Sequence, residues 1–469
     1  MFSSFSAFSA RGRGAARLAA VTLVSGLVAA GALATAGAAV AEETPQNQAG
    51  ATATIGGLKT YGSAVIHDNG EDQPVSAGLF EMSVDNGGTL QTYCVDLHNP
   101  TQKDAKYQET AWSGTSLNGN ANAGKIRWIL QNSYPQVNNL AALAAKAGAA
   151  GLTEQDAAAG TQVAIWRYSD DADVDAVDPR AEKLADYLEK NARNLPEPAA
   201  SLTLDSPAVS GHAGEKLGPV TVHTDADSVT VTPPADAATS GVRIVDTDGK
   251  EVTSATDGSR LYFDVPTDTA DGSASLTVQA STTVPVGRAF ASETRSQTQI
   301  LAGSSESTVA ATATADWAAE GPIPALSAEK NCAEGGVDVT AANEGDEPFT
   351  FELVGIEHTV PAGESRTVTV PLQEDRSYDF AVKGTDGSEK RFTGMLDCRT
   401  QGSTSEVTTQ TVGEPSPAAS VSTFSDTTDL AATGSSDATP VIAGIAIVLV
   451  VVGGAAIVLV ERKKTPGQH

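Results

Sequence analysis

Residues 153–168 read TEQDAAAGTQVAIWRY, and this stretch is the strongest single indication of the fold. Thr153 is a favourable N-cap residue, and Glu154 and Asp156 place negative charge in the first turn, where the helix dipole favours it. The stretch therefore predicts a helix from Thr153 to about Tyr168. Its second half carries the run T-Q-V-A-I-W.

Strand-like runs precede this helix. They are Tyr61 to His67, Gly78 to Val84 and Leu90 to Leu97. The triplet Asn86-Gly87-Gly88 is a hairpin signal between the last two runs. Helical patterns recur at Lys125 to Asn132 and at Pro179 to Arg193. Residues 50–195 are thus predicted to form one α+β domain.

The residue pattern changes from helical to strand-like after residue 195. Leu195-Pro196-Glu197-Pro198 is a stiff linker, and the Thr/Val alternation that follows predicts a β-sandwich over residues 199–320. A second linker, residues 321–324, leads to a smaller β domain at residues 327–399. The expected fold class is multidomain: an α+β domain followed by two all-β, immunoglobulin-like sandwich stalk domains.

Both ends of the chain carry targeting signals. Basic residues, an apolar stretch and the pattern Ala39-Val40-Ala41 predict that residues 1–41 are a secretory signal peptide. Residues 441–460 form an apolar run long enough for a transmembrane helix, and residues 461–469 form a basic cytoplasmic tail. Residues 400–429, rich in Ser, Thr, Pro and Gly, predict a disordered spacer. The alternative at either end is an ordinary membrane anchor.

A short motif stands just before the apolar run: Leu430, Ala431, Ala432, Thr433 and Gly434. The order of motif, apolar span and basic tail resembles a sortase sorting signal of the LAxTG type. The resemblance implies cleavage between Thr433 and Gly434 and attachment of Thr433 to a peptidoglycan precursor. It also implies a secreted protein held in the wall of a Gram-positive cell, whose precursor is only transiently in the plasma membrane.

The composition excludes several kinds of protein. The 469 residues include 30 Lys+Arg against 58 Asp+Glu, a net charge of −28. This acidity argues against nucleic-acid binding, which needs basic stripes to neutralise phosphates. The six histidines show no metal-ligand spacing, so neither a metal nor a cofactor is expected.

The three cysteines divide into a pair and a single residue. Cys332 and Cys398 bracket the small C-terminal domain, and we predict that they form a disulfide. Cys94 is then left over, and an odd cysteine in an exported protein needs an explanation. It could be a buried free thiol, part of an intermolecular disulfide, or a catalytic nucleophile with His98 or His67 as its base. Neither histidine lies in a recognisable protease signature.

A fourth explanation rests on two motifs. Cys94 lies in Tyr93-Cys94-Val95-Asp96-Leu97, at the end of a predicted strand, and Gln162 lies in Thr161-Gln162-Val163-Ala164-Ile165-Trp166 on the predicted helix. In this order the two motifs resemble the thioester (TQXA) domain of Gram-positive surface adhesins. The resemblance implies a thioester between Cys94 Sγ and the Gln162 side-chain carbonyl, formed with loss of ammonia. It implies a surrounding pocket shaped by Tyr93, Thr161, Ala164 and Trp166.

We therefore expect a cell-surface adhesin that attaches covalently to a target through a single acyl transfer. It is not an enzyme, because Gln162 is consumed. The expected partners are peptidoglycan at Thr433 and an amine or hydroxyl on an unknown host or matrix macromolecule, with no nucleic acid and membrane contact only before sorting. The alternatives are a structural wall protein without covalent capture and a secreted thiol enzyme that regenerates Cys94.

Overall fold

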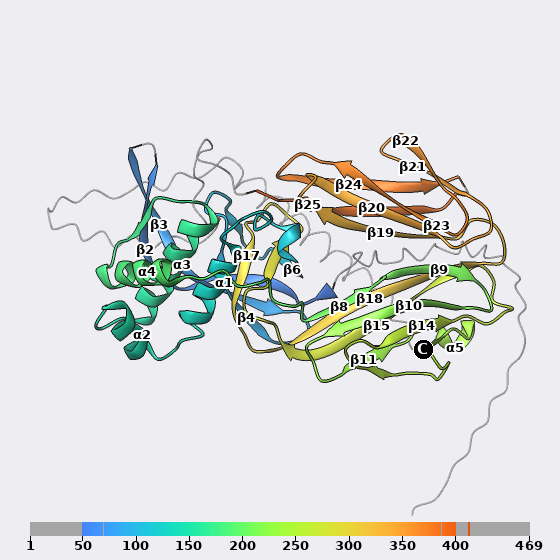
Figure 1. Ribbon diagram of the computed structural model, residues 1–469, viewed down its shortest axis with the longest axis horizontal. Coiled ribbons are helices and arrows are strands. Elements are labelled where there is room, and N and C mark those ends of the chain that lie inside the picture. The colour runs from blue at the N-terminus through green and yellow to red at the C-terminus, as the bar shows by residue number, and fades with distance from the viewer. Residues whose placement is uncertain (1–48, 69, 386, 400–410, 413–469) are drawn as a thin grey trace, which may run out of the picture. The chain divides into compact units, whose positions relative to one another are not determined.

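The computed structural model describes residues 49–68, 70–385, 387–399 and 411–412, all in one compact unit (Figure 1). The predicted signal peptide, sorting motif, transmembrane helix and basic tail lie outside these residues. Nearly all of the predicted spacer lies outside them too. None of the helices in the described ranges combines the length and apolar character that a bilayer span requires.

The first region corresponds to the predicted α+β domain. It is built on a sheet with the strand order β3-β4-β17-β16-β6-β2-β7. The strands are β2 (Thr52–Asp68), β3 (Glu71–Val84), β4 (Thr89–Cys94), β6 (Lys106–Thr110), β7 (Val174–Ala176), β16 (Ala289–Ser292) and β17 (Gln299–Ser304). Because β2 also pairs with β3, the ladder of strands closes on itself. The β3–β4 hairpin turns at the predicted triplet, where Asn86, Gly87 and Gly88 have φ values of 66°, 116° and 106°. Glycine adopts such values readily.

Helices gather beside this sheet (Figure 1). They are α1 (Ala123–Asn132), α2 (Leu140–Ala147), α3 (Glu154–Ser169) and α4 (Pro179–Asn191), with the short 3₁₀ helix η1 (Trp112–Gly114). The predicted N-cap is correct: the Thr153 side chain accepts from Asp156 N at 3.1 Å, and Thr153 N donates to the Asp156 carboxylate at 3.0 Å. Helix α4 packs so closely on α3 that a Cβ at Gly160 would lie 2.4 Å from the Ala181 carbonyl oxygen, which only glycine avoids. Helix α2 was not predicted.

The middle region contains two sheets. One has the order β1-β18-β15-β11-β13, with β9 also paired to β18, and the other has the order β12-β14-β10-β8. The first comprises β1 (Ala49–Gly50), β9 (Ala208–His212), β11 (Val229–Thr232), β13 (Ser254–Ala255), β15 (Gly272–Thr283) and β18 (Glu306–Ala318). The second comprises β8 (Leu202–Asp205), β10 (Lys216–Thr224), β12 (Arg243–Val245) and β14 (Arg260–Asp264), and α5 (Ala237–Ser240) lies between β11 and β12.

The domain boundaries differ from those expected at 50–195 and 199–320. Strands β16 and β17, predicted to lie within the middle sandwich, are part of the first sheet, where they pair with β6 and β4. Strand β1, at the start of the first region, pairs with β18 of the middle region. The buried apolar residues of both regions form one continuous core. Alternation reveals a strand but not its partner, so the sequence pattern could not detect this exchange.

A buried ion pair ties the exchanged segments together. Glu109 on β6 and Arg288 just before β16 meet at 2.9 Å, with side chains only 1% and 6% exposed. The Glu109 carboxylate also accepts from Ala51 N at 3.1 Å and Ser201 N at 2.9 Å. Arg288 reaches Glu197 of the linker at 2.8 Å. The expected stiff linker is therefore held against the first sheet.

The third region has its own core. Its sheets have the orders β19-β20-β23 and β22-β21-β24-β25. The strands are β19 (Pro324–Asn331), β20 (Gly336–Asn343), β21 (Phe349–Leu353), β22 (Ile356–Val360), β23 (Glu364–Pro371), β24 (Arg376–Gly384) and β25 (Glu389–Leu396). Within the predicted spacer, Thr411 and Val412 form β26, which pairs in parallel with β5 (Thr101–Gln102). At these two residues the prediction of disorder was wrong, because β5 offers backbone partners there.

Candidate functional site

Cys94 and Gln162 meet in the interior of the first region. Cys94 is the last residue of β4, Gln162 lies in the middle of α3, and both are completely buried. The Cys94 thiol lies 3.3 Å from Gln162 Oε1, which also accepts from Cys94 N at 3.1 Å. Gln162 Nε2 donates to the Cys94 carbonyl at 2.9 Å. The backbone of Cys94 thus holds both ends of the carboxamide and fixes it beside the thiol.

The four predicted pocket residues are all fully buried: Tyr93, Thr161, Ala164 and Trp166. Tyr93 and Thr161 adjoin the reacting residues in the chain, whereas Ala164, two positions after Gln162, lies on the other side of α3. The Tyr93 hydroxyl donates to the Tyr134 carbonyl at 2.8 Å, and Thr161 Oγ1 donates to the Ala157 carbonyl at 2.7 Å. Trp166 stands one helical turn after Gln162, and its indole N–H acts on the Cys94 thiol and lowers the pKa of that thiol. The pocket therefore excludes water and brings a hydrogen-bond donor to the sulfur.

The opposite wall of the site comes from a segment that sequence reasoning missed. Gln299 on β17 pairs directly with Cys94, and its Oε1 accepts from Thr92 at 2.9 Å. The carbonyl of Thr298 accepts from Val95 N at 3.1 Å. The sequence offers one signal here, the uninterrupted apolar run Ile300-Leu301-Ala302, because a sandwich strand with one face in solvent usually alternates apolar and polar residues.

Burial sets the protonation state of the thiol. Burial first, and then the negative charges of Asp170 and Asp96, raise the pKa of Cys94, while Trp166 acts in the opposite direction. A thiol in such surroundings stays protonated at neutral pH. Cys94 therefore lacks the electropositive environment in which catalytic cysteines become thiolates.

Neither histidine considered as a base contacts the thiol through a hydrogen bond within the described ranges. His67 lies on β2, where its two ring nitrogens approach Asp72 at 2.7 Å and Asp175 at 3.4 Å. These carboxylates raise the pKa of His67. His98 is half-buried and burial lowers its pKa, while its Nδ1 has no partner among the described residues. The geometry gives no support to a Cys–His catalytic pair.

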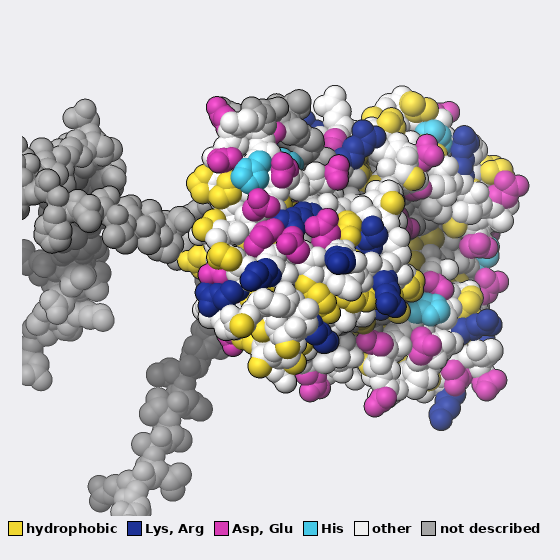
Figure 2. All heavy atoms as spheres, turned by 60° about the vertical axis from the view of Figure 1, so that its left-hand side comes forward, with side chains coloured by type: hydrophobic (Ala, Val, Ile, Leu, Met, Phe, Trp, Pro, Cys, Tyr) yellow, Lys and Arg dark blue, Asp and Glu magenta, His cyan; other side chains and the backbone are white. Residues whose placement is uncertain are grey.

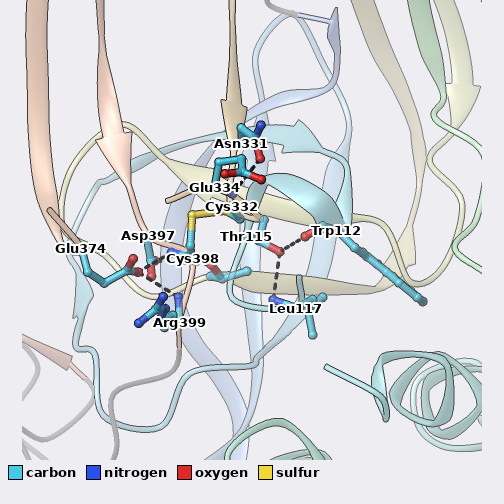
Figure 3. The surroundings of a disulfide bond; sticks show 11 residues. Trp112, Thr115, Leu117, Asn331, Cys332, Glu334, Glu374, Asp397, Cys398 and Arg399 are labelled. Carbon is cyan, nitrogen blue, oxygen red and sulfur yellow. Dashed lines mark hydrogen bonds between the residues drawn. A yellow bond between two sulfur atoms is a disulfide. The ribbon is translucent and has the colours of Figure 1, made fainter. Parts of the chain in front are cut away.

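The predicted disulfide between Cys332 and Cys398 is present, with its Cα atoms 5.2 Å apart (Figure 3). Glu374 lies beside it and accepts from the backbone N–H groups of Cys398 and Arg399, the latter at 2.8 Å. The ligand oxygens of Glu374, Asp375 and Asp397 lie within 4.8 Å of one another. This spacing suits a cation, but Glu374 already accepts two backbone donors. The oxygen Asp397 Oδ2 also accepts from Thr298 at 3.5 Å, so the third region reaches the strand that faces Cys94.

The surface beside the helices carries mixed charge. In Figure 2 acidic, basic and apolar side chains are interspersed on this face, and its described residues gather into no broad basic patch.

Comparison with known proteins identifies two segments. Residues 91–194 match the family described as "Thioester domain", and residues 309–395 match "Bacterial phospholipase C, C-terminal domain". No curated protein matches the chain.

Solved structures give weaker likenesses. "The Bacillus anthracis TIE protein" is 14% identical, with 78% of this chain and 82% of that chain covered and a TM-score of 0.26. "Thioester domain of the Enterococcus faecium TIE86 protein" is 18% identical, with 59% and 97% covered and a TM-score of 0.27. Both TM-scores are too low to establish a common fold. The chain thus contains a segment that matches the thioester-domain family, and both Cys94 and Gln162 lie inside it.

Proposed function

We propose that Cys94 and Gln162 condense into an internal thioester, and that the protein uses this bond to attach once to a target. The observation that carries the proposal is the buried contact of 3.3 Å between the Cys94 thiol and the Gln162 carboxamide. The match of residues 91–194 to the thioester-domain family supports it.

The chemistry balances with these two side chains alone. The thiol sulfur of Cys94 attacks the side-chain carbonyl carbon of Gln162, the C–N bond breaks, and ammonia leaves with the thiol proton. An amine or hydroxyl of the target then attacks the same carbon, and Cys94 leaves as a thiol. The product is an amide or an ester, and Gln162 cannot be restored without a new source of ammonia. The protein is therefore a single-turnover acyl donor and not an enzyme.

The pocket suits a bond that must survive in water until a target arrives. Both reacting side chains are completely buried, and the ring of Trp166 is buried beside them. Exclusion of water slows hydrolysis. Trp166 Nε1, which acts on the Cys94 sulfur, is placed to stabilise the thiolate that develops when the sulfur leaves.

The rest of the chain suits a surface adhesin. The N-terminal signal, the motif Leu430–Gly434 and the apolar run after it support export and attachment to peptidoglycan at Thr433. The middle and third regions then serve as immunoglobulin-like stalk domains, and residues 413–429, after the pairing of β26 with β5, as the wall spacer. The partner is a surface amine or hydroxyl on a host or matrix macromolecule.

Methylamine is the direct probe of the reactive bond. Incubation with methylamine should add it to Gln162, as located by peptide mass spectrometry, and should release one Cys94 thiol. The Gln162→Ala protein should give no adduct. Gln155→Ala is the matched control, because Gln155 is exposed on the same helix and its loss should leave labelling unchanged. An unmodified Gln162 in the wild-type protein would contradict the proposal.

A second experiment separates an adhesin from a structural wall protein. Incubation with extracts of candidate surfaces should give covalent complexes that survive boiling in detergent and reductant, and that contain Gln162 joined to a target residue. Wild-type protein that labels with methylamine yet forms no such complex on any surface would favour the structural role.

A further inference from the structure

Two carboxyl groups, those of Asp96 and Asp170, act on the Cys94 thiol. Asp96 follows Cys94 by two residues and is completely buried. Asp170 caps the C-terminus of α3. Within the described residues neither forms an ion pair, since their hydrogen-bond donors are backbone N–H groups, an amide and a hydroxyl.

These contacts place both groups along one edge of the site. Asp170 accepts from Leu97 N at 3.0 Å and from Ser169 Oγ at 2.6 Å. Asp96 accepts from His98 N at 3.3 Å and from the Asn99 side chain. Gln162, Trp166 and Asp170 recur every fourth residue on α3 and therefore share one face of the helix. This face of α3 contacts the segment from Cys94 to Leu97. The reacting pair and the two carboxyl groups therefore lie along the same interface between α3 and that segment.

A completely buried carboxylate and a partly buried one oppose each other's ionisation at this site. Burial and the charge of Asp170 raise the pKa of Asp96, and burial raises the pKa of Asp170. From the third region, the charge of Asp375 raises the pKa of Asp96 further, and Asp96 and Asp397 repel each other. The pair therefore holds one proton under conditions in which an exposed carboxyl group would be ionised, and it contains an acid and a base together.

Thioester formation needs such a pair. The buried thiol must lose its proton, and the Gln162 nitrogen must gain one, because an amide anion is a very poor leaving group. The described histidines form no hydrogen bond to either group, whereas the charges of Asp96 and Asp170 act on the Cys94 thiol.

We propose that Asp96 transfers the proton from Cys94 Sγ to the departing nitrogen of Gln162, and that Asp170 is a positioning residue that keeps Asp96 able to hold a proton. This inference rests on the proposed thioester. As the S–C bond forms and the C–N bond breaks, Asp96 takes the thiol proton and gives one to nitrogen, so ammonia leaves and Asp96 ends as it began. When an amine attacks later, the same group passes the amine proton to the departing sulfur.

The experiment measures methylamine labelling of Gln162 against pH in the full ectodomain, together with the fraction of protein that has lost ammonia. Asp96→Asn keeps the shape of the side chain but cannot carry a proton, so labelling should slow by about 100-fold or more. Asp96→Glu should recover part of the rate. Asp173→Asn is the control, because Asp173 is exposed beyond the end of α3 and its loss should change nothing.

Asp170→Asn gives a reading that a merely structural role would not produce. Removal of the Asp170 charge lowers the pKa of Asp96, so the inflection of the rate profile should move to lower pH. Wild-type labelling and pH profile in folded Asp96→Asn protein would overturn the inference. If Asp96→Asn does not fold, an unchanged inflection in Asp170→Asn would overturn it. Wild-type protein without a thioester is a different result, since it removes the proposed function itself.

Discussion

The first and third regions are both rich in strands, but they are assembled in opposite ways. The site of the first region is made by β4, α3 and β17, so residues 94, 162 and 299 come together from segments far apart in the chain. The third region runs from β19 to β25 without exchange and has a core of its own. The comparison teaches that a completely buried pair of polar side chains needs walls from several segments, whereas a contiguous domain can be stabilised by a single disulfide.

The largest effect should come from the disulfide. Replacing Cys332 and Cys398 with serine opens a loop of 66 residues, which costs about 4 kcal/mol in the chain-entropy model. Because the third region has a separate core, the loss should appear as early unfolding of that region alone. Urea titration followed by limited proteolysis measures it. An equal shift in the unfolding of the first region would show that the two regions are not independent.

The buried ion pair Glu109–Arg288 should have the next largest effect, and this effect should fall on the first region rather than the third. Glu109→Ala leaves Arg288 and two backbone donors without their main acceptor, which should cost about 3 kcal/mol of unfolding free energy. The first and middle regions should then unfold together at lower urea concentration, because they share a core. Glu81→Ala is the control: the exposed Lys59–Glu81 pair, at 4.0 Å, should contribute less than about 1 kcal/mol. If Glu109→Ala lowers the unfolding free energy as little as Glu81→Ala does, the Glu109–Arg288 pair does not hold the exchanged segments together.

The carboxyl pair predicts an unusual pH dependence for the first region. The folded-state pKa values of Asp96 and Asp170 are raised. At pH values above the ordinary pKa range of carboxyl groups, the native state therefore holds more protons than the unfolded chain. Stability should therefore fall as pH rises from that range toward the raised values, by about 1.4 kcal/mol for each pH unit over which the native state holds one extra proton. Melting temperatures from pH 4 to pH 9 test this. The slope should flatten in Asp96→Asn, and a wild-type stability that rises over this window would contradict the assignment.

The smallest effect should come from the helix cap. Thr153→Ala removes an acceptor from the N-terminus of α3 and should cost about 1 kcal/mol. Thr247→Ala, at an exposed position outside any helix, should cost almost nothing. If urea unfolding shows no difference between the two variants, the cap does not contribute to the stability of the site-bearing helix.

Local features of the molecule could be predicted from sequence, and long-range pairings could not. The Thr153 cap, the hairpin at Asn86-Gly87-Gly88 and the Cys332–Cys398 disulfide depend on a few residues or on counting cysteines. Strand β17 has an apolar pattern that fits any buried position, so nothing in it names Cys94 as its neighbour.

The same limit applies within the site. Cys94 and Gln162 could be paired because each lies in a motif, and Asp96 stands in the motif of Cys94. Asp170 and Gln299 lie in no motif, and their proximity to the thiol depends on how α3 and β17 fold against β4. Chemistry carried by motifs is thus readable from sequence, while the groups that tune it appear only in three dimensions.

The intact mass of the exported protein tests the central claim most directly. If Cys94 and Gln162 form a thioester, the unreduced protein should be lighter than its sequence by one ammonia, in addition to the two hydrogens lost in the Cys332–Cys398 disulfide. The Cys94→Ala and Gln162→Ala proteins should show only the loss due to the disulfide. A wild-type protein that retains this ammonia and has a free Cys94 thiol on denaturation would contradict the account.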